Sequence, residues 1–169
     1  GAFGLFYHFL DVKTGKWHAN NDAVSTADTA DLIAGVITCM EYFKGTEIER
    51  LGDEIVRACE WDRFLSDNAG ERRRFIAMGY LPPGRKSSWN SEKGFFGRYY
   101  GYTDNSFLIY LLGIASPTHP LPVESWYACQ ATYKRQTYDG MTVVTTDPPG
   151  LAFHYYHHCW LDLAGRKDQ

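Results

Sequence analysis

Two stretches of the chain share one layout, and this repetition constrains the fold more than any other feature. Residues 17–43 and 95–122 each begin with an aromatic and polar loop, continue with Thr and an aspartate, and then become strongly apolar. Within the first stretch the apolar residues recur at i, i+3 and i+4, which is the period of an amphipathic helix. The pattern predicts helices over residues 26–43 and 103–115, and Gly45 is the expected stop of the first.

A shorter and more charged helix is predicted after each apolar one, over residues 46–60 and 123–133. Only a few residues join the first two helices, so they should form an antiparallel αα-hairpin. An apolar inner helix backed by a charged outer helix, repeated along a chain, is typical of an α/α toroid. The expected fold class is therefore all-α, with short β-hairpins and long loops.

Two helix pairs cannot close a ring. We interpret residues 1–169 as one region of such a toroid, a fragment of a longer domain. The remaining helices would come from sequence outside these residues or from a partner chain. Without that cover, the apolar helices would leave a large exposed patch, which is unusual for a monomer.

The segments between the helices carry weaker signals. The patterns predict a β-hairpin over residues 3–17 and a strand over 75–81, with strand character at Met141–Thr145 and a helix at 155–163. The run Ser116-Pro117-Thr118-His119-Pro120-Leu121-Pro122 should form a rigid corner, with Pro122 as the first residue of the next helix.

Composition excludes several partners and favours one. The chain has 17 basic and 20 acidic residues, so no positive surface points to nucleic acid. No run reaches the roughly 20 apolar residues of a membrane-spanning helix. Aromatic residues make up 16% of the chain, with 12 Tyr and 5 Trp, which exceeds what packing requires. Many lie in loops beside Gly and Pro, where they would stack on sugar rings or close a lid.

The two ends of the sequence and its cysteines give little information about the fold or the function. No signal peptide or initiator Met is visible, so the chain starts at a processed end or belongs to something longer. The four cysteines form no C-x-x-C pair and no spacing that points to a particular disulfide. We expect free thiols, with Cys39 and Cys129 buried in helices as small hydrophobic residues.

Asp28 and Asp104 are the candidate functional carboxylates. Asp28 lies three residues after Ser25, in the S-x-x-D form of a capping box. Asp104 follows Thr103 at the start of the other apolar helix. Each has a structural alternative, because a carboxylate in the first turn is stabilised by the helix dipole. The aromatic loop before Asp104 favours the functional interpretation.

The histidines near the C-terminus suggest a metal site only weakly. His154 and His158 have the i, i+4 spacing that lets two imidazoles share an ion. The spacing places no third ligand, so we expect no metal and no other cofactor. Sugar binding by His158 and stacking by Trp160 is the preferred interpretation, with aromatic core packing as the alternative.

Several separate motifs, in order, resemble the bacterial glucoamylase-like domain family, which includes the endo-β-1,2-glucanases of glycoside hydrolase family 144. The chain is also similar to the related domain of cyclic β-1,2-glucan synthases. The motifs are Phe6-Tyr7-His8-Phe9-Leu10-Asp11, Ser25-Thr26-Ala27-Asp28-Thr29-Ala30, Gly101-Tyr102-Thr103-Asp104, Tyr110-Leu111-Leu112, Ser116 to Pro122, and His154 to Asp162.

The resemblance implies an (α/α)6 barrel that hydrolyses β-glucan, with β-1,2-glucan favoured, by inverting acid/base catalysis. Asp28 and Asp104 are the implied catalytic carboxylates. The substrate-binding residues that it implies are His8, Tyr102, His119, His158 and Trp160. It also implies a periplasmic or extracellular location.

The chain departs from the family pattern at a few positions. Ala23 and Tyr100 stand where acids are common, and Asp104 replaces a longer Glu. Tyr155 and His157 replace a Gln and a small polar residue. Two alternatives to a hydrolase therefore stay open: a non-catalytic glucan-binding module whose acids have drifted, and a transglycosylase.

Overall fold

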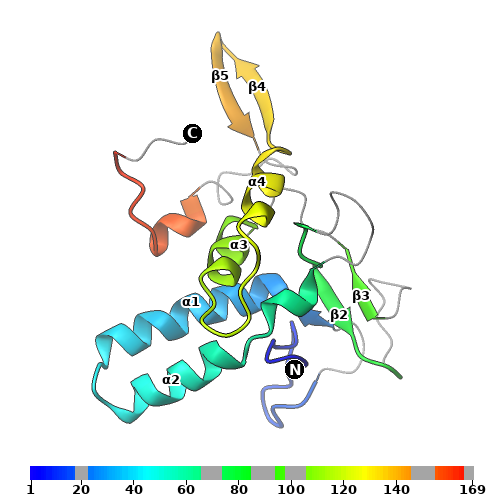
Figure 1. Ribbon diagram of the computed structural model, residues 1–169, viewed down its shortest axis with the longest axis vertical. Coiled ribbons are helices and arrows are strands. Elements are labelled where there is room, and N and C mark those ends of the chain that lie inside the picture. The colour runs from blue at the N-terminus through cyan, green and yellow to red at the C-terminus, as the bar shows by residue number, and fades with distance from the viewer. Residues whose placement is uncertain (18–22, 66–73, 85–93, 98–105, 146–154, 166–169) are drawn as a thin grey trace.

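The computed structural model describes residues 1–17, 23–65, 74–84, 94–97, 106–145 and 155–165 (Figure 1). Tyr102, Asp104 and His154, which are discussed above, lie outside these ranges. The described part is helix-rich and also contains two small sheets. None of its helices combines the length and apolarity that crossing a bilayer requires.

The first predicted helix pair is confirmed. Helix α1 spans Thr26–Tyr42 and α2 spans Glu47–Ala58, and Figure 1 shows them side by side as an antiparallel hairpin. Their contact is close at Gly52 of α2, where a Cβ would lie 2.3 Å from Cγ of Met40. All the buried residues of α1 lie between Thr26 and Ala34, and the rest of the helix is half-buried or exposed.

The second pair is also present, although the predicted first residues of its apolar helix, 103–105, lie outside the described residues. Helix α3 spans Ser106–Ile114 and α4 spans Glu124–Gln130. Pro122 is not the first residue of α4, because the N-cap is Val123 and the helix begins at Glu124. Helix α3 packs against both α1 and α4. The more apolar helix of each pair is the more buried one, as the pattern predicts.

A three-stranded antiparallel sheet lies at the start of α1. Its strands are β1 (Val24–Ser25), β2 (Gly79–Leu81) and β3 (Gly94–Phe96), in the order β1-β2-β3. Only β2 falls inside a predicted strand. The others are two and three residues long, so their pairing with distant segments gives no local pattern.

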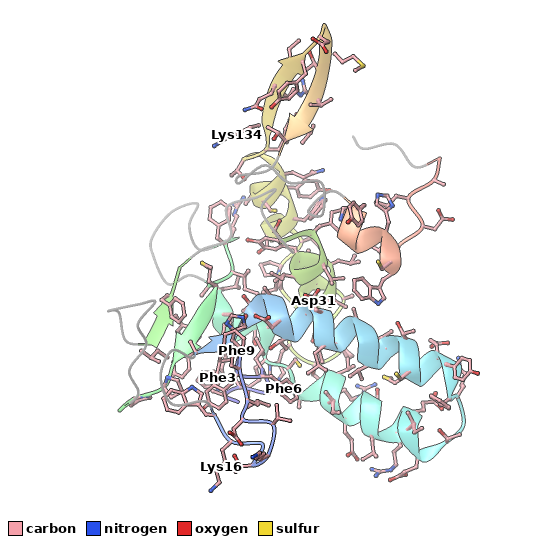
Figure 2. All side chains as sticks on the ribbon, turned by 180° about the vertical axis from the view of Figure 1, so that it is seen from behind. Phe3, Phe6, Phe9, Lys16, Asp31 and Lys134 are labelled. Atoms are coloured by element: carbon pink, nitrogen blue, oxygen red, sulfur yellow. The ribbon has the colours of Figure 1, made fainter. Side chains whose placement is uncertain are left out.

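A second sheet is the hairpin of β4 (Lys134–Tyr138) and β5 (Met141–Thr145). Strand β5 confirms the predicted strand character, whereas β4 was expected to be loop. Asp139 and Gly140 connect the strands with φ of 46° and 79°, which is the left-handed pair of a type I′ turn. Figure 2 shows this hairpin projecting beyond Lys134, away from the other strands.

The N-terminal segment forms only the turn of the short hairpin predicted over residues 3–17, where the Asp11 N–H donates to the Lys16 carbonyl (2.8 Å). A tight turn instead joins Ala2 and Leu5, which exchange two backbone hydrogen bonds of 3.0 Å. Further along, Leu10 pairs with Trp17 as an isolated bridge, and Tyr7 pairs with Val24. The segment therefore runs along the beginning of α1, because β1 offers it a partner.

The core lies where α1, α3 and the 3-10 turn Trp61–Phe64 (η1) meet. Its largest fully buried side chains include Trp61, Tyr110 and Phe64. The Tyr110 hydroxyl accepts a hydrogen bond of 3.2 Å from the Ile76 N–H. Burial raises the pKa of Tyr110 far above its ordinary value, so this phenol stays neutral.

The four cysteines are free thiols, as expected. Cys129 is buried as predicted, but Cys39 is exposed, and Cys59 is buried instead. The burial prediction for Cys39 was wrong because it lies on the part of α1 beyond Ala34, where the contact with α2 at Val36 and Met40 leaves Cys39 exposed.

We expect Cys59 and Cys129 to resist alkylation in the folded protein. Burial raises the pKa of Cys59 to about 11 and that of Cys129 to about 12, and a hydrogen bond from Ser106 offsets part of the latter shift. Because the thiolate is the nucleophile, the fraction available at pH 8 falls by about 10²-fold or more. Iodoacetamide labelling read by peptide mass spectrometry should modify the exposed Cys39 and Cys159 before Cys59 and Cys129. Equal labelling rates at Cys59 and Cys159 would contradict this.

Candidate functional site

Asp28 lies in the first turn of α1, and the N-cap Ser25 holds it there. The Asp28 N–H donates to Ser25 Oγ (3.3 Å), and the Ser25 hydroxyl donates to Asp28 Oδ2. In a complete capping box the carboxylate would accept the N-cap N–H. Here the Ser25 N–H donates to the Phe6 carbonyl (3.0 Å). The carboxylate is therefore not needed for that half of the cap.

The other carboxylate oxygen of Asp28 faces His8. Nε2 of His8 lies 3.6 Å from Oδ1 of Asp28, which is close enough for an ion pair but long for a hydrogen bond. The side chains are 36% and 46% exposed, so the pair is open to solvent. The His8 ring stacks on Phe9 at 3.9 Å between centroids, and Figure 2 places Phe9 at the start of α1. An imidazole, a carboxylate and an aromatic face thus meet at one helix end.

The second predicted carboxylate, Asp104, lies outside the described residues, and so does Tyr102. The described part of α3 begins two residues later, at Ser106. The separation between Asp28 and Asp104 therefore stays a prediction. Ser106 is buried and α3 packs on α1, so the described helix that follows Asp104 in the sequence is a neighbour of the helix that carries Asp28.

His119 is placed away from the His8–Asp28 pair. The Nδ1 atom of the His119 ring lies 3.2 Å from Oδ1 of Asp62 in η1. The backbone N–H of His119 donates to Ser116 Oγ (3.2 Å). The neighbouring Thr118 hydroxyl donates to the Arg57 carbonyl in the last turn of α2 (2.7 Å). These contacts fasten the corner after α3, whereas Asp104 precedes α3. The sugar-binding role predicted for His119 draws no support from them.

The C-terminal aromatic segment lies beside α3. A 3-10 turn spans Tyr156–Cys159, in which His158 is exposed, and the half-buried Trp160 packs against the core. The neighbouring His157 is buried, and its ring stacks on Phe107 at 4.5 Å. His157 is not among the site residues predicted from the sequence, and its departure from the family pattern is the one sequence signal that distinguishes it.

A metal site finds no support in the described part of the chain, where no three His, Cys, Asp or Glu side chains gather in a way that would hold an ion. The rings of His157 and His158 lie 4.7 Å apart. His154, the third member of the sequence pattern, lies outside the described residues.

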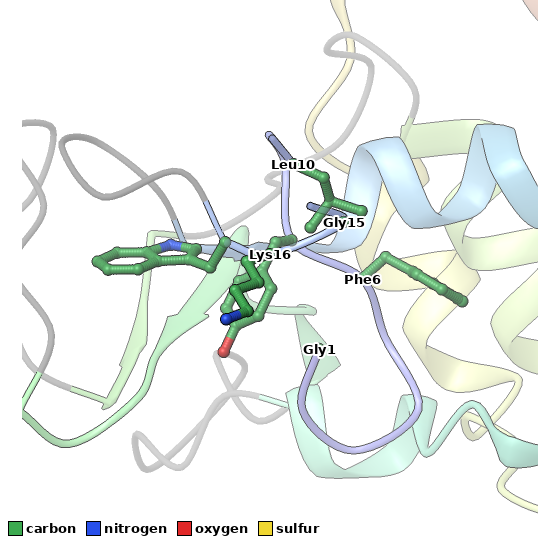
Figure 3. Close-up of a pocket in the computed structure, with 7 residues that line it drawn as sticks. Gly1, Phe6, Leu10, Gly15 and Lys16 are labelled. Carbon is green, nitrogen blue, oxygen red and sulfur yellow. The ribbon is translucent and has the colours of Figure 1, made fainter. Parts of the chain in front are cut away.

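A groove of about 520 Å³ lies on the N-terminal segment (Figure 3). Its lining consists of Gly1, Phe6, Tyr7, Leu10, Gly15, Lys16 and Trp17. Tyr7 lines it, whereas its neighbour His8 does not. The lining contains no carboxylate, so this aromatic groove is distinct from the Asp28 site.

Two independent comparisons bear on the family. Residues 98–169 match the family model Glycoamylase, described as "Putative glucoamylase". The predicted resemblance to the glucoamylase-like domain family is confirmed. A comparison with curated protein sequences gave no match.

Several solved structures share the glucoamylase-like fold with this chain. An endo-β-1,2-glucanase from Chitinophaga pinensis, solved with sophorotriose and glucose, has 21% identity and a TM-score of 0.66 over 84% of this chain. A Bacteroides caccae protein described in the same words as the family model has 20% identity and a TM-score of 0.77 over 99% of this chain. A β-1,2-glucanase from Parabacteroides distasonis has 18% identity and a TM-score of 0.74, also over 99%.

The chain spans only part of each of these proteins. It covers 34% of the Chitinophaga pinensis chain, 41% of the Bacteroides caccae chain and 27% of the Parabacteroides distasonis chain. At these identities the likeness concerns the fold.

Proposed function

We propose that these residues form part of an (α/α)6 toroid in a glycoside hydrolase that acts on β-glucan, with β-1,2-glucan as the favoured substrate. The observation that carries the proposal is the half-exposed Asp28 carboxylate beside His8. The pair lies at the N-terminal end of α1, in a chain that shares its fold with endo-β-1,2-glucanases. The sequence outside these residues, or a partner chain, would supply the remaining helices.

The proposed mechanism is inverting acid/base hydrolysis. One carboxyl group protonates the glycosidic oxygen, and a second carboxylate takes a proton from the attacking water. Asp28 and Asp104 are the proposed pair, which inversion requires to be about 6.5–9.5 Å apart. Asp28 suits such a role, since one of its oxygens accepts from Ser25 and the other faces His8 across an open gap.

The proposed glucan subsites use side chains that carry ring faces and hydrogen-bonding groups. His8 lies beside Asp28, and its neighbour Phe9 is exposed. Tyr102, His158 and Trp160 complete the proposal from the sequence. His119 stays a weaker member of the set, because it contacts Asp62. A periplasmic or extracellular location is proposed with this substrate, and cell fractionation would check it.

The deciding experiment is incubation of the full-length protein with linear β-1,2-glucan, with reducing ends measured over time. Proton NMR of the first products should show α-anomers, the result of inversion at a β-linkage. No reducing ends from a folded protein would overturn the hydrolase proposal for this substrate. Longer or cyclic products would instead identify a transglycosylase.

A non-catalytic glucan-binding module is the second candidate. The observation that favours it is Ala23, which stands where the family commonly has an acid and is buried, with its carbonyl bound to the His8 N–H at 3.0 Å. Calorimetry separates the candidates, because a module binds β-1,2-glucan oligosaccharides without turning them over.

A further inference from the structure

Thr29 joins two parts of the candidate site through one buried hydroxyl. The residue is 0% exposed. Its Oγ1 donates to the Ser25 carbonyl (2.6 Å) and accepts the N–H of Phe6 (3.0 Å). A single hydroxyl therefore connects the N-cap of α1 with the segment that carries His8.

This connection sets the register of that segment. The Phe6 carbonyl accepts the Ser25 N–H, so both backbone polar groups of Phe6 bind the start of α1. Two residues later the His8 N–H donates to the Ala23 carbonyl (3.0 Å). With Phe6 and His8 both fixed, the imidazole is placed 3.6 Å from the Asp28 carboxylate.

A second buried threonine in the same helical turn, Thr26, makes hydrogen bonds to a different segment of the chain. Thr26 is also 0% exposed, and its hydroxyl donates to the carbonyls of Ala77 (3.0 Å) and Met78 (2.8 Å). It ties α1 to the chain before β2, and none of its hydrogen bonds reaches residues 6–8. The two threonines thus divide the anchoring of the first turn between two segments.

We propose that Thr29 is a positioning residue that fixes the separation of His8 and Asp28. It acts through the Phe6 N–H and does not touch the reacting atoms. Its effect on turnover rests on the proposed function, whereas its effect on the His8 imidazole does not.

The kinetic test compares Thr29→Val, Thr29→Ser and Thr26→Val in the full-length protein. Valine has the shape of threonine without the hydroxyl and leaves the Phe6 N–H unpaired, so the segment should shift. Because a misplacement of about 1 Å can cost about 10²-fold, we expect kcat on β-1,2-glucan to fall by about tenfold or more, with KM changed less than about threefold. Thr29→Ser should recover kcat to within about threefold of the parent.

Thr26→Val is the matched control, because it also removes a buried threonine hydroxyl from the same helical turn. We expect it to lower the melting temperature comparably and to leave kcat within about threefold. In a His8→Gln background, Thr29→Val should lower kcat by less than about threefold. The imidazole through which Thr29 affects turnover is already absent there. Equal losses of kcat from Thr29→Val and Thr26→Val, or full additivity with His8→Gln, would overturn the proposal.

A second measurement does not depend on activity. In protein labelled with ¹³C at histidine Cε1, the His8 signal is identified by its absence in His8→Gln. It should move in Asp28→Asn and in Thr29→Val, and stay in place in Thr26→Val and Thr29→Ser. If Thr29→Val does not fold, Thr29→Ala takes its place. If the His8 signal does not move in Thr29→Val, the positioning role is wrong. If the protein does not hydrolyse β-1,2-glucan, the NMR result still decides whether Thr29 positions His8.

Discussion

Replacing Asp28 with Asn should lower the rate of β-1,2-glucan hydrolysis by about 10²–10⁴-fold, the range that one general acid or base contributes. The amide keeps the size of the side chain but cannot exchange a proton with water or with the glycosidic oxygen. Its oxygen can still accept from the Ser25 hydroxyl, so the N-cap should persist. Loss of the first-turn charge should cost about 0.3–1 kcal/mol of stability. Initial rates from reducing-end release, with melting curves beside them, provide the measurement.

Asp53→Asn is the matched control for this substitution. Asp53 has a side chain that is 45% exposed, against 46% for Asp28, and it also faces a cationic partner, Arg57 at 2.7 Å. It lies on α2, where such ion pairs contribute little. We expect its rate to match the parent within about twofold. If Asp28→Asn retains more than about a third of the parent rate, Asp28 is not an acid/base carboxylate and the binding-module candidate gains.

Gly4→Ala should destabilise the protein by about 3 kcal/mol or more, the largest stability effect that we expect from any single added methyl group. Gly4 has φ of +75°, and a Cβ there would lie 1.7 Å from the Ala58 carbonyl oxygen. That oxygen belongs to the backbone at the end of α2, so no side-chain rotation relieves the clash. Urea unfolding followed by tryptophan fluorescence should show a lower midpoint.

Gly15→Ala separates the clash from the backbone conformation. Gly15 has a similar φ of +63°, but nothing lies within 4 Å of its Cβ position. Only the left-handed conformation is then penalised, at about 1–2 kcal/mol. Similar urea midpoints for Gly4→Ala and Gly15→Ala would contradict this prediction. They would show that the end of α2 moves away from the added methyl group, so the contact between Gly4 and Ala58 is not rigid.

The helix pairs could be predicted because their signals are local. Apolar spacing identified α1, and Thr46 before an acidic first turn is a usual N-cap for α2. Their shared surface needs only a short connection and a small residue, Gly52, at the contact. Helix α4 was predicted one residue too long at its start and three at its end, and the caps Val123 and Ala131 both have helical dihedral angles just outside the helix.

The small sheets could not be predicted because they depend on distant partners. Strand β1 pairs Val24 with Tyr80, and β2 pairs Leu81 with Gly94, so no window of sequence contains the pattern. The β4–β5 hairpin is different. Asp139-Gly140 is a strong hairpin signal, but neither strand of this exposed hairpin has the alternating apolar face that would predict both strands from the sequence.

The candidate site was predicted in part. The S-x-x-D spacing predicted a helix cap at Asp28, which is confirmed because the Asp28 N–H donates to Ser25 Oγ, whereas the catalytic role of Asp28 stays a prediction. The family resemblance implied His8 as a substrate-binding residue, and its position beside Asp28 was not predicted. The spacing of the motifs could not reveal the role of Thr29, because a hydroxyl in a helix gives no sign of which distant N–H it accepts.

The uneven burial of α1 divides this helix into two parts that should differ in local stability. The half that carries Asp28 is embedded from Thr26 to Ala34, and it opens only when the core opens. The half toward Tyr42 is half-buried or exposed and contacts α2 at Met40, so opening it locally should cost less than opening the embedded half. The embedded half therefore determines how precisely Asp28 is presented to a ligand.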